Sequence, residues 1–396
     1  MLSVAEARAQ ILAAARSPGD PEMVALADAA TRTLAEPIVA RADIPPFANS
    51  AMDGFVVAPG PAERRLRIAG EARAGHPLAA PAHLGEAIRI STGAPVPAGG
   101  EAVVPIERVR EDDGWITLTA TVAAGDHVRG AGEDVCAGAT AAAPGTVLGA
   151  VELGIAAASG NAQLACAPRP RVAVVVTGDE LIGAGEPLGP GQIHDSNAIM
   201  LATAARRAGA DASRLATIGD DRKATEQGLA EALEGADVLV VSGGVSVGPH
   251  DHVKGALAQL DVEERFWRVA LKPGKPTWFG TRGAQLVFGL PGNPVSAYVC
   301  FALFVAPALR AMLGRSALPQ RGLARLGAAV AAAPAREQAI GARIEHGPTG
   351  TTAWPVGQQG SHRLSSLLGA EVLVSLPASA RETAAGAEVE FEPLPR

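Results

Sequence analysis

Between residues 172 and 313 the chain alternates short runs of β-branched residues with helical stretches. Such an alternation is typical of a parallel β-sheet covered by helices on both faces, because parallel strands need long crossover connections. The predicted strands are residues 172–176, 214–218, 238–241, 265–270 and 286–290. The predicted helices lie near residues 197–208, 221–234, 250–260 and 294–313. The pattern therefore predicts an α/β multidomain protein with a central doubly wound, mostly parallel sheet.

The segments on either side of this block have different patterns. Residues 45–145 are rich in glycine and proline and contain short strand-like runs, which predicts a β-rich domain. Residues 1–44 and 146–170 are helical in pattern, so we expect them to pack together as a connecting subdomain. The α/β domain is expected to span residues 171–316. Short alternating strands in residues 317–396 predict a small C-terminal β barrel.

Charge, cysteine content and hydropathy argue against several classes of protein. The chain has 41 acidic and 34 basic residues, a net charge of −7, so we expect no nucleic-acid partner. Its three cysteines are far apart and odd in number, which fits a reducing cytoplasm better than a disulfide framework. The amino terminus reads as a capped helix, and the longest apolar run, residues 295–309, is shorter than the roughly 20 residues of a membrane span. We therefore expect a cytoplasmic location and no membrane segment.

Glycine-rich or charged motifs follow the predicted strands of the α/β domain. Ligands of open α/β sheets bind in the crevice outside the carboxyl ends of the strands, so these motifs are expected to converge. Their residues are Thr177, Gly178, Asp179, Glu180, Asp220, Ser242, Gly243, Gly244, Ser246, Lys272, Lys275, Pro291, Gly292, Asn293 and Pro294. Each motif alone could be a turn or a helix cap. Their convergence at one edge favours a binding site.

The charged residues of these motifs indicate the kind of ligand. Lys272 and Lys275 are two of only four lysines among 34 basic residues, which favours point charges placed against an oxyanion or phosphate. The carboxylates expected in the same crevice are Asp179, Glu180, Asp220 and Asp251. They would repel one another without a cation, so we expect Mg²⁺, which shares its ligand shell with substrate phosphates. A zinc site at His250 and His252 stays an alternative if a third ligand converges.

Seven motifs, in order over essentially the whole chain, resemble the molybdopterin molybdenumtransferase family, that is, MoeA and the E domain of gephyrin. They are Asn-Ser-Ala-Met-Asp-Gly at 49–54, Thr-Gly-Ala-Pro-Val-Pro at 92–97, Gly-Glu-Asp at 132–134, Thr-Gly-Asp-Glu-Leu at 177–181, Ser-Gly-Gly-Val-Ser at 242–246, Lys-Pro-Gly-Lys-Pro at 272–276 and Leu-Pro-Gly-Asn-Pro-Val-Ser at 290–296. The resemblance implies an enzyme that hydrolyses adenylylated molybdopterin and transfers molybdate to its dithiolene, giving molybdenum cofactor and AMP with the help of Mg²⁺. It also implies a homodimer in which the α/β domain of one subunit faces the β-rich domain of the other.

The resemblance also implies roles for individual residues. Those expected to hold molybdate or phosphate oxygens are Lys272, Lys275 and Ser296. Those expected to cradle the pterin phosphate are Ser242, Gly243 and Gly244. The expected metal ligands are Ser246, Asp251 and Asp220. The residues expected to orient water and the pterin are Asp179 and Glu180, with Asp53 and Thr92 of the facing subunit. The residues expected to act in catalysis are Asp53, Asp179, Glu180 and Lys275.

Two other functions fit parts of the sequence. A molybdopterin adenylyltransferase is similar in its α/β domain, but it would not need residues 49–54, 92–97 or 318–396. A scaffold of the gephyrin kind would have no reason to keep the lysines and carboxylates together. An enzyme is therefore preferred. Docking with the adenylyltransferase, or with enzymes that accept the cofactor, is a further interaction that the resemblance suggests.

Overall fold

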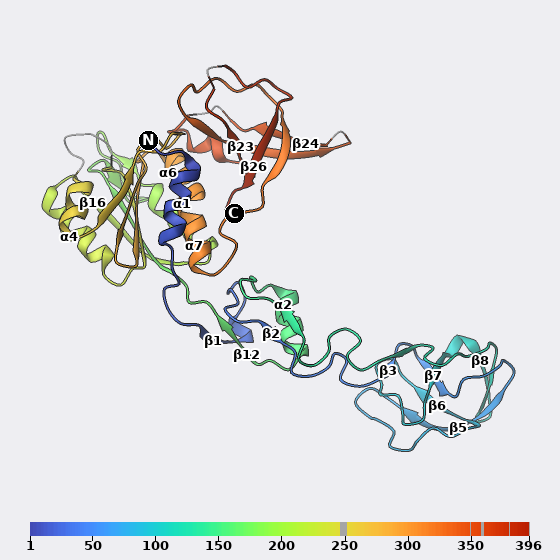
Figure 1. The fold of residues 1–396 in the computed structure, drawn as a ribbon. Coiled ribbons are helices and arrows are strands. Elements are labelled where there is room, and N and C mark those ends of the chain that lie inside the picture. Colours follow the sequence, from blue (N-terminus) through green and yellow to red (C-terminus); the bar gives the residue numbers. More distant parts are fainter. Residues whose placement is uncertain (246–251, 349, 358–359, 380, 396) are drawn as a thin grey trace.

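The protein is elongated and built of four parts. The computed structural model describes residues 1–245, 252–348, 350–357, 360–379 and 381–395. The α/β domain and the C-terminal barrel lie together at one end, and the β-rich domain lies at the other (Figure 1). A small connecting subdomain joins the two ends.

The α/β domain contains a six-stranded sheet of order β16-β13-β17-β21-β20-β18. The strands are β13 (Arg171–Thr177), β16 (Asp211–Ile218), β17 (Val238–Ser242), β18 (Glu263–Trp267), β20 (Trp278–Arg282) and β21 (Gln285–Leu290). The first four strands in the sheet order are parallel to one another, whereas β20 is antiparallel to both of its neighbours, β21 and β18. The predicted mostly parallel sheet is confirmed, but the prediction missed β20. The predicted strand at 265–270 was also too long, because Arg268 has a φ of +74° and ends β18 at Trp267.

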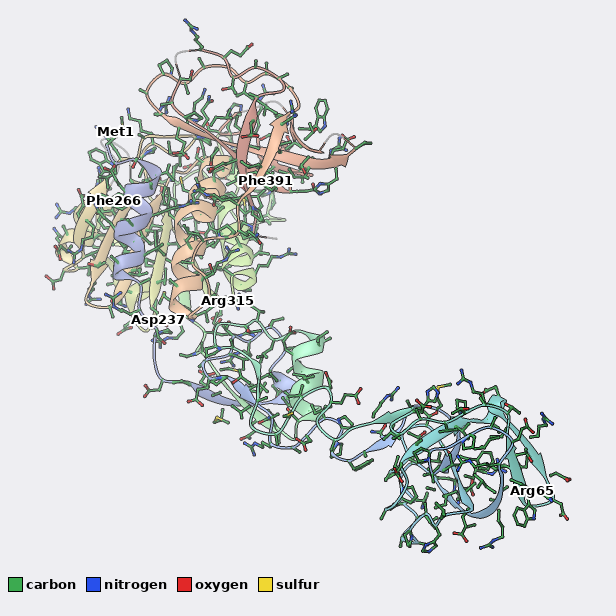
Figure 2. All side chains as sticks on the ribbon, turned by 45° about the vertical axis from the view of Figure 1, so that its right-hand side comes forward. Met1, Arg65, Asp237, Phe266, Arg315 and Phe391 are labelled. Atoms are coloured by element: carbon green, nitrogen blue, oxygen red, sulfur yellow. The ribbon has the colours of Figure 1, made fainter. Side chains whose placement is uncertain are left out.

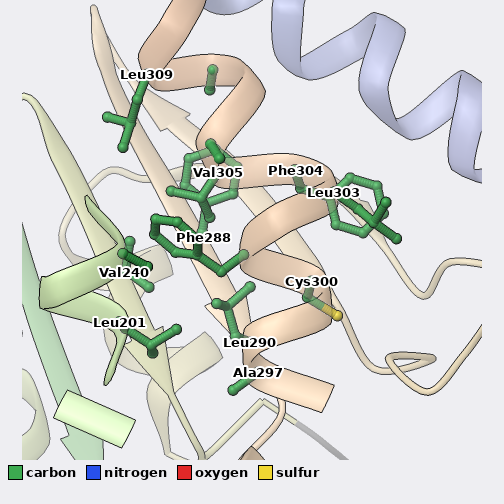
Figure 3. Close-up of a cluster of buried hydrophobic side chains, with 14 of the residues drawn as sticks. Leu201, Val240, Phe288, Leu290, Ala297, Cys300, Leu303, Phe304, Val305 and Leu309 are labelled. Atoms are coloured by element: carbon green, nitrogen blue, oxygen red, sulfur yellow. The ribbon is translucent and has the colours of Figure 1, made fainter. Parts of the chain in front are cut away.

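Helices cover both faces of this sheet. They are α3 (Asn197–Arg207), α4 (Arg222–Leu233), α5 (Val253–Gln259), α6 (Pro294–Cys300), the π-helical turn η3 (Phe301–Val305) and α7 (Ala306–Met312). Successive strand residues point to opposite faces, so Val172 and Val174 join the core under α3 and α6, whereas Ala173 and Val175 join the core under α4 and α5. Figure 3 shows Phe288 and Leu290 of β21 packed against the long helix that runs from α6 to α7.

Helix α1 (Val4–Ala14) corrects one part of the domain prediction. It was predicted to lie in the connecting subdomain. In the structure Val4, Ala7 and Ile11 belong to the core of the α/β domain, and α1 contacts η3 and α7. The periodicity of a helix does not say which neighbour its apolar face meets, so this assignment needed the tertiary structure.

The long helix is a core element. Among the described residues one helix, Pro294–Met312, is long and apolar enough to cross a membrane by length and composition, and 78% of it is buried inside the protein. Burial to this extent is what a core helix requires.

The connecting subdomain is partly made of strands. Its elements are β1 (Glu22–Ala25), η1 (Leu26–Asp28), β2 (Ile38–Val39), β11 (Thr140–Ala142), α2 (Ala150–Ala158) and β12 (Gln163–Cys166). Strand β1 pairs with β12, and β2 pairs with β11. Leu34, Leu148 and Leu164 lie in its small hydrophobic core. Two chain segments that enclose the β-rich domain in the sequence thus meet in one unit.

The β-rich domain holds a six-stranded sheet of order β7-β4-β6-β5-β9-β8. Its elements are β3 (Asn49–Ser50), β4 (Gly54–Val57), β5 (Arg65–Ala72), β6 (Glu86–Ile90), β7 (Ala102–Pro105), η2 (Ile106–Arg108), β8 (Val109–Asp112), β9 (Trp115–Leu118) and β10 (Val128–Arg129). Strand β3 pairs with β10 at the side of the sheet. Arg65 of this domain lies at the opposite end of the molecule from Phe266 of the α/β domain (Figure 2).

The C-terminal region forms the predicted barrel. Its elements are β22 (Gly322–Leu326), β23 (Glu337–Gly347), β24 (Gly350–Pro355), η4 (Leu364–Leu367), β25 (Val372–Leu376) and β26 (Glu388–Pro393). The ring of pairings closes because β23 bonds to both β24 and β25. Strand β19 (Leu271–Lys272) of the α/β domain adds to β23. Two short strands, β14 (Leu181–Ile182) and β15 (Ile193–His194), pair beside the main sheet.

Candidate active site

The loops that carry the predicted motifs lie along one edge of the α/β sheet. Thr177 pairs with Ile218 at the ends of β13 and β16, and Ser242 pairs with Leu290 at the ends of β17 and β21. The next strand of the sheet after β13 in the sequence, β16, pairs with one side of β13. The strand after that, β17, pairs with the opposite side, so the direction in which strands are added to the sheet reverses at β13. Ligands of open α/β sheets bind at such a point.

The glycine loop after β17 is packed directly against Thr177. A Cβ atom at Gly243 would lie 2.6 Å from Thr177 Oγ1 and 2.8 Å from the Thr177 carbonyl oxygen. Gly243 and Gly244 also have φ values of +102° and +63°, in the region that glycine favours. Thr177 Oγ1 is itself buried without a hydrogen-bond partner in the part of the chain that the structure describes. The two glycines therefore let the loop after β17 pack closely on the buried Thr177 hydroxyl and on Val253.

Asn197 is a buried residue that the sequence analysis missed. Its Nδ2 donates to Ser242 Oγ at 2.9 Å and to the Gly292 carbonyl at 2.7 Å, and Ser242 Oγ donates to the Pro291 carbonyl at 3.1 Å. Asn197 thus ties the loops after β17 and β21 to the first residue of α3. A usable signal was Asp195, whose Oδ1 accepts hydrogen bonds from the N–H groups of Asn197 and Ala198 as in a helix start.

The loops after β13 and β16 bring two predicted carboxylates together. Asp179 Oδ1 accepts a hydrogen bond from the Asp220 N–H at 2.9 Å, and the Gly178 N–H donates to the Ile218 carbonyl at 3.1 Å. Asp221, and not Asp220, caps α4, since its Oδ1 accepts from the Ala224 N–H at 2.9 Å. Asp179 is exposed and Asp220 half-buried. The cap interpretation therefore does not account for Asp220, whose backbone N–H holds the Asp179 carboxylate next to it.

Glu180 and Gly178 form the outer part of the same loop. The Glu180 side chain is exposed, and its carboxylate lies close enough to Gly178 that a Cβ atom there would collide with it. Gly178 has a φ of +149°. These contacts hold a third carboxylate beside the β13 end.

The lysine loop reaches the same edge from β20. Trp278, at the start of β20, pairs with Gly289 near the carboxyl end of β21. Gly274 has a φ of +121°, and a Cβ atom on it would lie 2.5 Å from Cys300 Sγ. The Gly274 carbonyl accepts a hydrogen bond from Thr277 Oγ1 at 2.7 Å. The loop is thus packed on α6, and burial raises the pKa of the Cys300 thiol to about 12, so this thiol stays neutral.

The three residues expected to hold molybdate differ in accessibility. Lys275 is exposed, Lys272 is half-buried and Ser296, in the first turn of α6, is only 3% exposed. The lysines can reach a ligand directly. Ser296 is the least accessible of the three.

The C-terminal barrel region also touches this edge. The Val295 N–H at the start of α6 donates to the Ser361 carbonyl at 3.1 Å, and Asn293 Nδ2 donates to Ser361 Oγ at 3.2 Å. Pro294 occupies the first position of α6, where its missing N–H costs nothing. A loop of the last domain therefore closes one side of the site.

Two predicted site residues belong to the β-rich domain. Asp53 Oδ1 accepts hydrogen bonds from the Thr92 N–H at 2.6 Å and the Thr92 hydroxyl at 2.9 Å. The bond from the Thr92 backbone, followed by that from its hydroxyl, lowers the pKa of Asp53. This pair lies in the domain at the far end of the chain, so it does not meet the lysines and carboxylates of the same chain (Figure 1).

The remaining predictions concern metal ligands. Ser246 and Asp251 lie outside the described residues, as does His250. Among the residues that are described, no three His, Cys, Asp or Glu side chains gather in a way that could hold a metal ion. Of the predicted metal ligands, Asp220 lies within the described residues, and its backbone N–H donates a hydrogen bond to Asp179.

Three family models match successive parts of the chain. They are described as the MoeA N-terminal region (domain I and II) for residues 2–160, a probable molybdopterin binding domain for residues 173–311, and the MoeA C-terminal region (domain IV) for residues 323–394. The matches follow the order of the parts seen in the structure.

Individual proteins resemble the chain over most of its length. Molybdopterin molybdenumtransferase 2 of Mycobacterium tuberculosis is 37% identical over 93% of this chain and 94% of its own length. The molybdopterin molybdenumtransferase of Haemophilus influenzae is 36% identical over 80% and 78%. The crystal structure of the molybdopterin biosynthesis MoeA protein from Pyrococcus horikoshii has a TM-score of 0.85, with 28% identity over 99% of this chain and 100% of that one. Together with the seven ordered motifs, these likenesses show that the chain belongs to the molybdopterin molybdenumtransferase (MoeA) family.

Proposed function

We propose that the chain hydrolyses adenylylated molybdopterin and transfers molybdate to the dithiolene, releasing molybdenum cofactor and AMP. The relatives are named as enzymes of molybdenum transfer to molybdopterin. The observation that carries the proposal is the meeting of a glycine loop, two lysines and a group of carboxylates at one sheet edge. These are the groups needed to bind phosphate, bind an oxyanion and direct water.

The lysines and the glycine loop would bind the anionic parts of the substrates. Lys272 and Lys275 present compact ammonium groups that suit the oxygens of molybdate. The Gly243 N–H already donates to the Leu290 carbonyl at 3.1 Å, so a phosphate would be bound by the next N–H of the loop, that of Gly244, while Asn197 holds Ser242 in place beside it. Because the loops are already fixed by hydrogen bonds, little ordering is required when substrate binds.

The carboxylates would act on water. Asp179 and Glu180 lie at the end of β13 beside the glycine loop, where each can accept a proton from, or orient, the water that attacks the phosphoanhydride. The buried Thr177 hydroxyl offers a further polar contact at the same point.

The donor set also fits Mg²⁺. Mg²⁺ takes hard oxygen ligands and is usually bound by one or two carboxylates together with substrate phosphates. Asp220 and the adjacent Asp179 are such carboxylates, and Ser246 and Asp251 are the other expected ligands. When bound, the ion would stabilise negative charge on the phosphoanhydride oxygens.

We further propose that the active enzyme is a cytoplasmic homodimer whose site is shared between copies. Asp53 is exposed and pre-positioned by Thr92, yet it lies far from the α/β edge of its own chain. A second copy would supply this pair to the site, as the family resemblance implies. We also propose that the enzyme docks with the adenylyltransferase, which makes its substrate, or with the enzymes that accept the finished cofactor.

One assay tests the proposal. The protein is incubated with adenylylated molybdopterin, molybdate and Mg²⁺, and AMP release is measured together with molybdenum bound to the pterin. We expect both products to form, and to depend on each component. ATP-dependent formation of the adenylylated pterin would instead indicate an adenylyltransferase. Absence of both activities would favour a scaffold.

A further inference from the structure

Lys275 lies in a tight turn that runs from Gly274 to Thr277, between β19 and β20. The turn is closed by a hydrogen bond from the Thr277 N–H to the Gly274 carbonyl at 3.2 Å. Its two central residues are Lys275, which is exposed, and Pro276, which is half-buried. Gly274 and Thr277 at its two ends are buried. An exposed cation thus stands on a buried base.

The sequence of this turn favours neither of the two common turn types. Proline at the third position, as Pro276 is here, is disfavoured in a type I turn, because it pushes the preceding residue out of the α region. A type II turn needs a positive φ at the same position, which the ring of proline excludes. Lys275 and Pro276 therefore do not fix the turn by their own preferences, and contacts from outside must hold it.

The Thr277 hydroxyl supplies the shortest of these contacts. Thr277 Oγ1 donates to the Gly274 carbonyl at 2.7 Å and lies 3.1 Å from Cys300 Sγ of α6. A hydroxyl has one proton, which is used here toward Gly274, so the thiol is the donor in the second contact. The Gly274 carbonyl belongs to the peptide group that precedes Lys275. The hydroxyl therefore fixes the plane of that peptide group.

The same contact joins the lysine loop to α6. Ser296, which is expected to hold molybdate oxygens, lies one turn before Cys300 on the same face of the helix. Figure 3 shows Cys300 on this helix. On the far side of Lys275, its carbonyl accepts a hydrogen bond from the Val269 N–H at 3.1 Å. Lys275 is thus held at both of its peptide groups and in register with the first turn of α6.

We propose that Thr277 is a positioning residue for molybdate binding: its buried hydroxyl, supported by Cys300, holds the turn that carries Lys275. This inference rests on the proposed function, which assigns Lys275 to molybdate. A long, flexible side chain binds an anion better when its backbone is already fixed, because less ordering is needed on binding. Thr277 does not touch the substrate in this role and acts through Lys275.

Binding of molybdate to the full chain, measured by calorimetry without the pterin, tests this role. Thr277→Val keeps the branched shape of the side chain but removes the hydroxyl. We expect it to raise the Kd for molybdate about fivefold, which corresponds to the net contribution of one hydrogen bond. Thr277→Ser restores the donor, so its Kd should lie within about twofold of that of the wild-type chain.

Thr281→Val is the matched control. Thr281 lies on β20, is also buried, and its Oγ1 accepts a hydrogen bond from Arg265 Nε at 3.1 Å. It pairs with Leu286 near the start of β21, away from the lysine loop. Both valine variants should lower the melting temperature by a similar amount, since each loses one buried hydrogen bond. Only Thr277→Val should weaken molybdate binding, and an equal change of Kd in both would argue against a positioning role.

Steady-state kinetics give a second readout that a loss of stability would not move. Thr277→Val should raise KM for molybdate about fivefold and leave KM for adenylylated molybdopterin unchanged. Its kcat should fall far less than that of Lys275→Ala, because the ammonium group is still present. A merely structural role would lower kcat through the fraction of folded enzyme and leave KM for molybdate as in the wild-type chain. Thr277→Ser should restore the wild-type KM.

Lys275→Ala separates a failure of this inference from a failure of the proposed function. If Lys275→Ala weakens molybdate binding but Thr277→Val leaves both Kd and KM unchanged, the positioning role is wrong and the proposed function stands. If Lys275→Ala binds and turns over molybdate as the wild-type chain does, the lysine loop is not the molybdate site and both fail. A wild-type chain that binds molybdate but releases no AMP would overturn the proposed function alone.

Discussion

At the scale of single residues, Arg8 shows how one side chain can join three elements, α1, the π-helical turn η3 and strand β26. Pro307 has no N–H, so the Leu303 carbonyl cannot receive the usual helical hydrogen bond from it. Arg8 Nε of α1 donates to that carbonyl at 2.8 Å. Its two terminal nitrogens each donate at 2.7 Å to Glu392 of the barrel. The arginine and the glutamate are 4% and 5% exposed.

Replacing Arg8 by alanine should therefore be costly. The change leaves the buried Leu303 carbonyl without its donor and leaves the buried Glu392 carboxylate with only the 3.1 Å hydrogen bond from Arg321, and breaking a buried pair typically costs about 3–5 kcal/mol. The expected result is a lower urea midpoint for the transition that includes the α/β domain and the barrel. Arg343→Ala is the matched control, because its ion pair with Glu345 spans 3.9 Å on the surface and should contribute less than about 1 kcal/mol. Equal effects of the two changes would contradict this view of Arg8.

The same pair gives stability a defined pH dependence. Burial by itself would raise the pKa of Glu392, but the hydrogen bonds and charge of Arg8, aided by Arg321, outweigh it and lower the pKa. Stability from the pair is thus fully present above the ordinary pKa of an unfolded glutamate. It is lost as the pH falls through the lowered pKa of the folded state. Thermal melts of wild type and Arg8→Ala should converge in acid, and a constant difference at every pH would argue against the pair.

Lys275 is expected to matter for turnover and not for folding. Its side chain is exposed and its loop is held by Gly274 and Thr277, so Lys275→Ala removes a charge without removing core packing. Loss of one group that stabilises developing charge commonly lowers kcat on the order of a hundredfold. Molybdate-dependent turnover should fall accordingly while the melting temperature stays within a degree or two of wild type. Unchanged turnover would remove Lys275 from the site.

At the scale of secondary-structure elements, the loops of the site are held in place by hydrogen bonds from a neighbouring helix. Asn197 at the start of α3 binds Ser242 and Gly292 through one amide nitrogen, so α3 holds the ends of β17 and β21 in register. The long helix shows a related adjustment. The Ala306 N–H bonds to Phe301, five residues earlier, in the π-helical turn that precedes Pro307.

Asn197→Ala should loosen both loops. A buried hydroxyl and a carbonyl lose their donor, which costs about 1–3 kcal/mol, and the glycine loop loses its fixed position. We expect kcat/KM for the adenylylated substrate to fall by a larger factor than that for Asn161→Ala. Asn161 bridges Val39 and Ser159 in the connecting subdomain in a similar way but lies away from the site. Comparable kinetics for the two variants would show that Asn197 only supports the fold.

At the scale of the whole molecule, the elongated shape decides how a complete site can form. The β-rich domain, which carries Asp53 and Thr92, lies at one end, and the α/β domain, which carries the lysines, lies at the other (Figure 1). A connecting subdomain with its own core separates them. A single copy therefore cannot bring the two groups to one substrate in this arrangement.

Mixing two inactive variants tests the sharing of sites. Asp53→Asn and Lys275→Ala chains are each expected to be nearly inactive. If a site combines the α/β domain of one copy with the β-rich domain of another, a mixed dimer contains one intact site. After subunit exchange, about a quarter of the wild-type sites should be restored. No recovery, with exchange shown by a tagged chain, would place each site within one chain.

Much of the fold followed from the sequence, because the relevant signals are local. The alternation of strands and helices predicted the α/β sheet, and β-branched runs identified its four parallel strands. Strand β20, with Trp278 and Gly280, was missed because a short antiparallel strand has no helix to mark it. The motif loops were expected at one edge, and the register of β13, β17 and β21 explains why they meet there.

The sequence by itself determined the family, the sheet and the chemical types present at its edge, since motifs, periodicity and charge are written in the order of residues. Only the tertiary structure decided which distant residues touch: that α1 packs on the long helix, that Asn197 ties two loops, and that Cys300 of α6 meets the lysine loop. Such contacts depend on how faces of separate elements pack. No local pattern specifies a neighbour that lies far away along the chain.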